Sequence, residues 1–255
     1  MKNTDAKIAV TKVDNPVIDI TNLRKSFGQQ EVLKGVSLQL LNEENLVVLG
    51  KSGSGKSVLI KCIVRLLHAD SGRIIVFDKD MTDINLKELA ELRKKIGFLF
   101  QSGALYDSMT VKQNLEFPLR RLKPDLNEKE VEEKVHEVLE NVGLADALNK
   151  MPSQLSGGMR KRISLARSIV VDPLIMLYDE PTTGLDPVTS DEISSLINEV
   201  QKKYKTSSLI ITHDIRCATN TANRIILLQE GEVYMEGTVK DFETSNDPII
   251  NSFFQ

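Results

Sequence analysis

The residues with the clearest chemical potential form a glycine-rich run, Gly50-Lys51-Ser52-Gly53-Ser54-Gly55-Lys56-Ser57, which fits the pattern GxxxxGK followed by Ser or Thr. Glycines permit backbone angles in which consecutive N–H groups point at a phosphate, and a following helix adds the positive end of its dipole. Lys56 is expected to reach the β- and γ-phosphates of a nucleotide, and the Ser57 hydroxyl to bind Mg²⁺. The competing interpretation is a glycine-rich turn without a ligand, and the apolar strand LVVL before it argues against that.

Two adjacent carboxylates, Asp179 and Glu180, end the apolar run LIMLYDE. A buried strand tolerates acids only at its exposed end, where a cation can compensate their charge. Asp179 is suited to the Mg²⁺ shell, and Glu180, which strand alternation turns the other way, to polarising the attacking water. Two solvent-exposed acids without a catalytic role would produce the same sequence pattern, but the phosphate loop upstream favours the catalytic interpretation.

A second cluster of small residues, Leu155-Ser156-Gly157-Gly158-Met159, stands where another helix is expected to begin. The first N–H groups of a helix have no partner inside the helix and can bind an anion. By itself SGG is a common turn. Together with the phosphate loop, however, it gives one chain two helix starts that are competent to bind phosphate.

The elements that must position these residues alternate between strand and helix. Strands are expected at PVIDI, VLKGVSLQLL, LVVL, RIIVF, IGFLF, LIMLY, SSLIIT and the hairpin RIILLQEGEVYMEG, with its turn at Glu230-Gly231. Helices are expected at SVLIKCIVRLL, NLKELAELRKKI, NEKEVEEKVHEVLENVGL, MRKRISLARSIVV and SDEISSLINEVQKKY. This alternation predicts an α/β fold whose mostly parallel sheet is covered on both faces.

From Ser102 to about Val171 the strand patterns disappear and helical patterns dominate. We interpret residues 102–171 as a helical insertion within a single domain that spans residues 1–255. Asn127 is expected to cap one of its helices and Gly143 to end it.

Composition narrows the classes of partner. The formal net charge of -3 disfavours general nucleic-acid binding, which needs clustered excess Lys and Arg. Cys62 and Cys217 lack metal-ligand spacing and indicate reduced thiols. The stretch MKNTDAKIAVTKVDNPV lacks an apolar core, so no signal peptide is expected, and the apolar runs fall short of the ~20 residues of a membrane span. A membrane pore would have to come from another chain.

The order of the motifs resembles that of ABC transporter ATPases over essentially the whole chain. The order is the phosphate loop at Gly50, Gln101 after a strand, LSGGM at Leu155, the strand end at Asp179, TTGLD from Thr182 to Asp186, and His213. The resemblance implies a P-loop NTPase fold of the ABC type, with an N-terminal antiparallel β-subdomain and an inserted helical subdomain. It also implies ATP and Mg²⁺ as cofactors and hydrolysis of the terminal phosphoryl group.

The same resemblance implies a second copy of the chain as a partner, paired head to tail. The LSGG turn of one copy would cap the ATP held by the phosphate loop of the other. Ser156 and Gly158 are then expected to touch the γ-phosphate in trans, with Gly157 in the same nucleotide-binding turn, and Asp186 is expected at the dimer contact.

Three further roles follow from family position. Gln101 is expected to sense Mg²⁺ or the water and to link the site to the helical insertion, and His213 to contact the γ-phosphate. Phe27 is expected to stack on adenine. The alternatives are a core phenylalanine and ordinary polar residues.

The segment from Phe100 to Leu122, FQSGALYDSMTVKQNLEFPLRRL, resembles the ATPase of Mla-type (maintenance of lipid asymmetry) transporters, whose substrates are phospholipids. LSGGM in place of LSGGQ fits the same group. This resemblance implies a permease and a lipid-binding subunit as partners, and a cytoplasmic location on the inner face of the cytoplasmic membrane. Leu105, Tyr106 and Met109 would either dock the permease or belong to the core of the insertion.

Other ABC machines remain open. An importer ATPase for amino acids or other small solutes would carry identical nucleotide motifs, and a soluble ABC ATPase of iron–sulfur assembly would have the same size. Chromosome-structuring relatives are disfavoured because no long coiled coil interrupts the chain, and a kinase with only a phosphate loop would not need LSGGM, TTGLD and His213 together.

Overall fold

The computed structural model describes residues 16–254, so positions 1–15 of the N-terminal stretch for which no signal peptide is expected lie outside the described residues. The strands are β1 (Ile18–Phe27), β2 (Gln30–Leu40), β3 (Asn45–Leu49), β4 (Ser71–Val76), β5 (Lys79–Asp80), β6 (Ile96–Leu99), β7 (Ile175–Asp179), β8 (Ser207–Thr212), β9 (Arg224–Gln229) and β10 (Glu232–Gly237). Within the described range they form a six-stranded sheet in the order β10-β9-β3-β8-β7-β6 and a four-stranded sheet in the order β2-β1-β4-β5.

The two sheets differ in strand direction. In the larger sheet β9, β3, β8, β7 and β6 pair in parallel, and only β10 at the edge is antiparallel. All pairs of the smaller sheet are antiparallel. The carboxyl ends of the parallel strands share one edge, which is where such sheets bind ligands.

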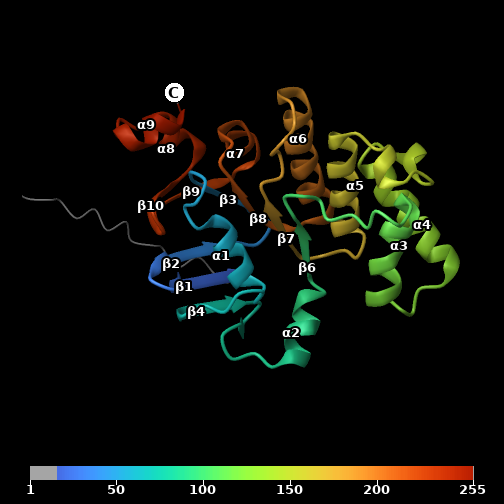
Figure 1. Ribbon diagram of the computed structural model, residues 1–255, viewed down its shortest axis with the longest axis horizontal. Coiled ribbons are helices and arrows are strands. Elements are labelled where there is room, and N and C mark those ends of the chain that lie inside the picture. The colour runs from blue at the N-terminus through green and yellow to red at the C-terminus, as the bar shows by residue number, and fades with distance from the viewer. Residues whose placement is uncertain (1–15, 255) are drawn as a thin grey trace, which may run out of the picture.

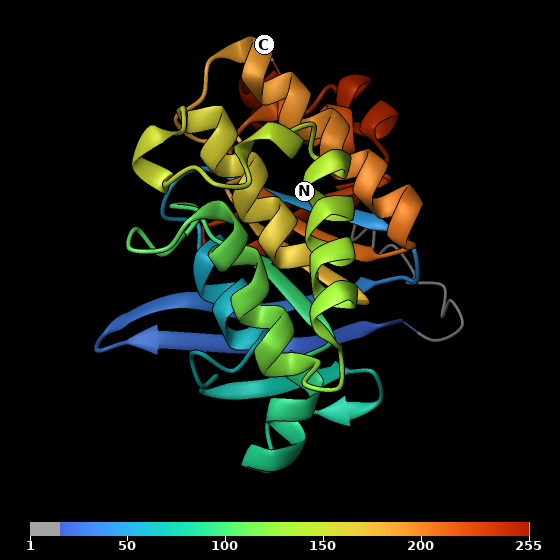
Figure 2. The same ribbon diagram turned by 90° about the vertical axis from the view of Figure 1, so that its right-hand side faces the viewer.

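Helices cover the sheets and fill the stretch between β6 and β7 (Figure 1). They are α1 (Lys56–Ile63), α2 (Leu86–Arg93), α3 (Val111–Leu122), α4 (Glu128–Asn141), η1 (Ala145–Ala147), η2 (Pro152–Gln154), α5 (Gly157–Ile169), α6 (Pro187–Tyr204), α7 (Ile215–Thr221), α8 (Val239–Glu243) and α9 (Pro248–Phe254). Figure 2 shows α3, α4 and α5 together in front of the sheets, at the end of the molecule farthest from β1 and β2 in Figure 1. None of the helices in residues 16–254 combines the length and the apolar character that a bilayer crossing requires.

The central strands are buried on both faces, as parallel strands under two helical layers must be. Along β3, Val47 and Leu49 join a hydrophobic cluster that includes α3 to α7, whereas Leu46 and Val48 join a cluster with α1, α2 and the smaller sheet. Both natural cysteines lie in these clusters, with Cys62 2% and Cys217 1% exposed. Alternation along each strand thus builds two cores on opposite faces of one sheet.

The predicted α/β fold, with its antiparallel N-terminal sheet and its helical insert, is confirmed. Asn127 caps α4 in a capping box with Glu130, and Gly143 follows the helix end with a φ of 67°. The predicted hairpin turn at Glu230-Gly231 is also confirmed, because both residues have positive φ between β9 and β10.

Some boundaries differ from the prediction. β1 continues past the expected PVIDI through polar residues to Phe27, since β2 and β4 pair with it from both sides across irregular register. α1 ends at Ile63 instead of reaching Leu67, because Arg65 adopts a left-handed φ of 56° and the N–H of Leu66 donates to the carbonyl of Lys61 at 2.9 Å.

Candidate functional site

The phosphate loop connects β3 to α1 at the carboxyl edge of the parallel strands. Two of its glycines are required by geometry. A Cβ on Gly50 would lie 2.4 Å from the carbonyl oxygen of Leu228, and Gly55 has a φ of 103° with Leu33 2.8 Å from its would-be Cβ. The loop can therefore follow this path only with glycine at both positions.

Lys56 is 5% exposed and lies at the centre of the loop. Its Nζ donates to the carbonyls of Gly50 at 2.7 Å and Lys51 at 3.1 Å, and forms an ion pair with Glu180 Oε1 at 3.4 Å. Burial lowers the pKa of the Lys56 ammonium, against the opposing influence of Glu180. A phosphate bound at this position would compensate the positive charge of the buried Lys56 ammonium.

Glu180 is 7% exposed, and polar groups organise both of its carboxylate oxygens. Besides the ion pair through Oε1, its Oε2 accepts hydrogen bonds from Thr183 Oγ1 at 3.3 Å, Thr212 Oγ1 at 3.4 Å and the His213 N–H at 3.3 Å. Nδ1 of His213 lies 2.8 Å from the same oxygen, so Nδ1 carries the proton of that bond, because a carboxylate can only accept.

The cause of the orientation of Glu180 differs from the prediction. Strand alternation was expected to separate it from Asp179, but β7 ends at Asp179 and Glu180 has a left-handed φ of 49°. This backbone turn, rather than a continuing pleat, brings its carboxylate to Lys56 and His213 while Asp179 meets Ser57.

Ser57 and Asp179 form a pair of oxygen ligands of the kind that Mg²⁺ prefers. The Ser57 hydroxyl donates to Asp179 Oδ1 at 3.1 Å. Burial raises the pKa of Asp179, the hydrogen bond from Ser57 opposes this shift, and the charge of Glu180 adds to it. A carboxylate that is 6% exposed and forms no ion pair with any residue in the range 16–254 fits a divalent cation.

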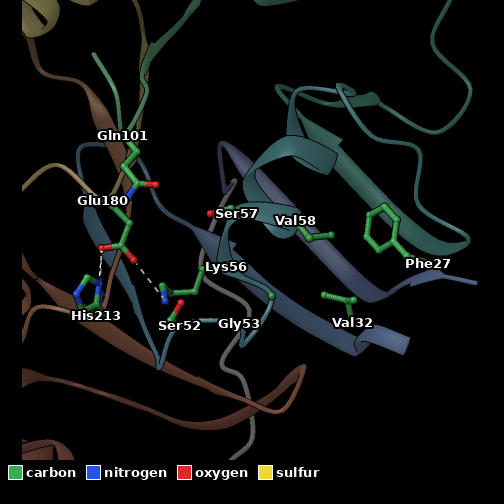
Figure 3. A pocket seen from close by; sticks show the side chains of 11 residues that line it. Phe27, Val32, Ser52, Gly53, Lys56, Ser57, Val58, Gln101, Glu180 and His213 are labelled. Carbon is green, nitrogen blue, oxygen red and sulfur yellow. Dashed lines mark hydrogen bonds and ion pairs between the residues drawn. The ribbon is translucent and has the colours of Figure 1, made fainter. Parts of the chain in front are cut away.

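Lys56, Ser57, Glu180 and His213 face a cavity of about 370 Å³. Its lining residues are Phe27, Val32, Ser52, Gly53, Gly55, Lys56, Ser57, Val58, Gln101, Glu180 and His213. In Figure 3 the charged groups lie at one end and Phe27 at the other, with Val32 and Val58 between them. An apolar end and a phosphate-binding end at one cavity match the two ends of a nucleotide.

The sequence model that matches the chain is that of the ABC transporter family, over residues 33–183. The chain belongs to the ABC transporter family.

Three relatives illustrate the breadth of the match. The chain is 37% identical over 254 residues to protein TRIGALACTOSYLDIACYLGLYCEROL 3, chloroplastic, of Arabidopsis thaliana, covering 93% of this chain and 73% of that protein. It is 39% identical over 236 residues to the probable ribonucleotide transport ATP-binding protein mkl of Mycobacterium leprae, covering 92% and 68%.

The third relative is the methionine import ATP-binding protein MetN of Rhizobium johnstonii, 37% identical over 223 residues, covering 88% of this chain and 61% of that protein. Among solved structures, the dimeric post-hydrolysis state of the ATP-binding cassette MJ0796 bound to ADP and Pi has a TM-score of 0.79 and 31% identity, covering 87% of this chain and 98% of that one. CbiO1 from Clostridium perfringens, part of the ABC transporter complex cbiONQ, has a TM-score of 0.83 and 28% identity, covering 95% and 96%. The predicted resemblance is confirmed, and this ABC transporter ATPase binds and hydrolyses ATP.

The LSGGM turn of this ABC ATPase does not meet its own nucleotide cavity. Ser156 caps α5, its Oγ accepting from the N–H of Met159 at 3.2 Å, and neither it nor Gly157, Gly158 or Asp186 lines the cavity. Asp186 caps α6 through Thr189, and a Cβ on Gly158 would lie 2.6 Å from that same Thr189. The turn and Asp186 thus share a second region, next to the start of α6.

Two residues of the phosphate loop also face away from the nucleotide cavity. Lys51 and Ser54 line a separate cavity of about 280 Å³, which lies against α9 and the end of β9. The Lys51 ammonium lies 5.5 Å from the ring centroid of Phe253, and the buried Ser54 hydroxyl has no hydrogen-bond partner. These two side chains are therefore placed behind the loop, and a role at the nucleotide would have to come from their backbone groups.

The apolar residues after Gln101 differ in burial, so some fit the core of the insertion and others fit a surface on which a permease could dock. Leu105 and Met109 are partly buried, and Leu105 packs against the core. Tyr106 is 45% exposed, contacts the 39% exposed Phe117 edge to face at 5.3 Å, and has the Arg167 guanidinium 5.7 Å from its ring centroid.

Sequence reasoning missed several residues of the site. Thr183 and Thr212 hold the Glu180 carboxylate, and Val32 and Val58 form the wall beside Phe27. The available signal was position, because Thr183 lies inside the TTGLD motif, which was quoted without a role for this residue, and Thr212 directly precedes His213. No sequence pattern indicated Val32, which β2 brings to the loop from a different sheet.

Proposed function

We propose that this chain works as a pair, in which each copy supplies the phosphate loop of one ATP site and the LSGGM turn of the other. The observation that supports the proposal most directly is that the nucleotide cavity and the LSGGM turn of the same chain lie apart. The helix start at Ser156 does not line the cavity of Lys56 and Glu180, and Ser156 and Gly157 are exposed there. A helix start competent to bind phosphate, without a phosphate loop beside it, needs a second chain to meet a nucleotide. The dimeric form of MJ0796 supports this arrangement.

Within each site we assign hydrolysis to three side chains. Lys56 exchanges the carbonyl of Gly50 for the β- and γ-phosphate oxygens. Glu180, held by its hydrogen bonds, polarises the water that attacks the γ-phosphorus as ADP leaves. His213 donates through Nδ1 to Glu180, and Nε2 of this half-exposed ring would donate to the γ-phosphate in the doubly protonated imidazolium, in which both nitrogens are donors.

We further propose that Ser57 and Asp179 hold Mg²⁺, with the side chain of Gln101 at the same end of the cavity. When bound, the ion neutralises the charge that develops on the phosphate oxygens. At the opposite end Phe27, 48% exposed at the end of β1, stacks on the adenine ring.

The helical insert is proposed as the part that meets a membrane partner. Residues 102–171 would act as one unit within a single domain of residues 1–255, with the Tyr106–Phe117 ring pair exposed on it. An integral permease docking there would place the ATPase on the inner face of the cytoplasmic membrane. The membership of CbiO1 in the complex cbiONQ supports a permease partner.

For the substrate we propose phospholipid, delivered through a lipid-binding subunit. The Mla-type resemblance of residues 100–122 supports this, as does a relative named for trigalactosyldiacylglycerol, which is a lipid. The second candidate is a small solute such as an amino acid, because another relative is named for methionine import.

The test uses tagged Glu180→Gln, which keeps the shape of the side chain but removes its charge. With ATP and Mg²⁺ this variant is expected to elute as a dimer in size-exclusion chromatography, whereas wild type hydrolyses its ATP and returns to monomer. Extraction from membranes in mild detergent and mass spectrometry would then identify the proteins and lipids that purify with it.

Each set of co-purifying molecules points to a different kind of ABC machine. A multi-span permease with a lipid-binding subunit and bound phospholipid supports the proposal. A permease with a solute-binding protein and no enriched lipid would support the importer alternative, and a soluble partner alone would point to a role outside transport. Failure of the variant to dimerise with ATP would contradict the paired mechanism.

A further inference from the structure

Lys161, near the start of α5, is a charged residue that the assigned chemistry does not use and that is only 5% exposed. Lysine is rarely buried to this extent unless it is paired, because removing its charge from water is costly. Among the described residues no carboxylate oxygen forms an ion pair with its ammonium. Burial lowers the pKa of Lys161, and the charges of Asp179 and Glu180 oppose that shift.

The partners of this ammonium are two backbone carbonyls of the site. Nζ of Lys161 donates to the carbonyl of Gln101 at 2.6 Å and lies 3.4 Å from the carbonyl of Glu180. One cation on α5 therefore joins the segment that follows β6 to the turn that follows β7. Figure 3 shows the side chains of Gln101 and Glu180 at the same end of the nucleotide cavity.

Other side chains of α5 hold the same segment. Arg167 donates to the carbonyls of Ala104 at 2.6 Å and Gly103 at 3.2 Å. Gly103 approaches the helix so closely that a Cβ there would lie 2.5 Å from Ser164 Oγ. Residues 101–104 are thus fastened to α5, but among these contacts only that of Lys161 continues to the backbone of Glu180.

We propose that Lys161 is a positioning residue, which transmits the placement of α5 to both Gln101 and Glu180. This inference rests on the proposed roles of those two residues in hydrolysis. α5 begins at the LSGGM turn and packs against α3 and α4 on one side and against β6 and α6 on the other, so it joins the insert to the parallel sheet. A shift of the insert would then move both the segment at Gln101 and the turn at Glu180, because the Lys161 ammonium contacts both.

The test is Lys161→Met in the full-length chain, because methionine keeps the unbranched apolar stem and removes the donors. We expect kcat for ATP to fall by about tenfold or more and KM to change by less than about twofold, since Lys161 does not line the nucleotide cavity. The melting temperature should stay close to that of wild type. The matched control is Lys129→Met, also in the insert, where the lysine side chain is 85% exposed.

A second readout follows the loop itself. The chain contains no tryptophan, so Ser102→Trp, at an exposed position next to Gln101, supplies a single fluorescent reporter. Its emission should change on addition of ATP and Mg²⁺ in the Lys129→Met background and stay unchanged in the Lys161→Met background.

The outcomes distinguish the positioning role of Lys161 from the proposed roles of Gln101 and Glu180 in hydrolysis. A wild-type kcat in Lys161→Met would overturn the positioning role. A fall in kcat that accompanies equal losses of melting temperature and nucleotide affinity would also overturn it, because it would assign the lysine to the stability of the fold. Retention of activity in Glu180→Gln would instead count against the proposed roles at the site and leave the contacts of Lys161 without a catalytic target.

Discussion

At the residue scale, the site works by pairing each buried charge with a group that a nucleotide complex can replace. Lys56 is held by loop carbonyls and Glu180, and Asp179 by the Ser57 hydroxyl. These partners keep the charges oriented, so the proposed binding of phosphate and Mg²⁺ would need little reorganisation. The single chain thus holds its phosphate loop and carboxylates in place, and in the proposed pair the second copy adds the LSGGM turn.

Phe27 allows a direct test of the apolar end of the cavity. Since its ring is 48% exposed, Phe27→Ala should leave the fold intact and remove only a stacking surface. Base stacking contributes ~1–3 kcal/mol, so KM for ATP should rise on the order of tenfold with kcat nearly unchanged. Steady-state kinetics would measure both constants. Leu66→Ala removes a similarly exposed apolar side chain elsewhere and serves as control, and an unchanged KM in Phe27→Ala would exclude the stacking role.

At the scale of elements, Asp172 ties the helices of the insert together. One of its carboxylate oxygens is 2.5 Å from Lys123 after α3, and the other is 2.6 Å from Lys134 on α4. Burial raises the pKa of Asp172, but the hydrogen bonds from both lysines outweigh it and the net shift is downward. A carboxyl with a depressed pKa stabilises the fold above its unfolded pKa, and this contribution is lost as pH falls through the folded value.

Asp172→Asn should therefore lower the melting temperature at neutral pH and have less effect in acid. Asparagine tolerates the left-handed φ of 54° at this position, so the backbone is preserved. Because the pairs are partly exposed, solvent screening limits their contribution to about 1 kcal/mol, or ~2–4 °C. Thermal unfolding at several pH values measures the effect, with the exposed Asp146→Asn as control. An equal loss at all pH values would show that charge is not responsible.

The elements and the site were predictable from the sequence to different extents. Lys56 and Glu180 were found because a phosphate loop and an acid at a strand end depend on local patterns of a few residues. The helix α7 was missed because it spans only Ile215–Thr221, although Asp214 at its start was a visible cap. Lys161 was missed because lysine on a helix predicts a solvated face, and only the folded chain brings the carbonyls that follow β6 and β7 to its ammonium.

At the scale of the whole molecule, the separation of the two phosphate-competent regions has a testable consequence for assembly. A Cβ on Gly157 would lie 3.7 Å from Leu185, an ordinary contact, so Gly157→Ala should fold as stably as wild type. In the proposed pair, the added methyl group would nevertheless face the nucleotide of the partner copy. We expect ATP hydrolysis to be lost while binding of ATP to the isolated chain is retained, as measured by ATPase assay and equilibrium dialysis.

Complementation decides whether the turn acts in trans. A mixture of Gly157→Ala with Lys56→Ala contains dimers in which one site combines an intact phosphate loop with an intact turn. Such a mixture should hydrolyse ATP although neither variant does so alone. Continued inactivity of the mixture, when chemical cross-linking shows that mixed dimers form, would place both motifs in one chain's site.

The burial of both natural cysteines also determines how this molecule can be labelled. Burial raises the pKa of Cys62 to about 11 and that of Cys217 to about 12. Because the thiolate is the reactive species, neither sulfur is a competent nucleophile toward maleimide at neutral pH. A cysteine introduced at an exposed site, such as Leu86→Cys at a residue that is 82% exposed, would therefore take a dye or spin label selectively. Distances between paired copies can then be followed through the hydrolytic cycle in the chain with both natural thiols kept.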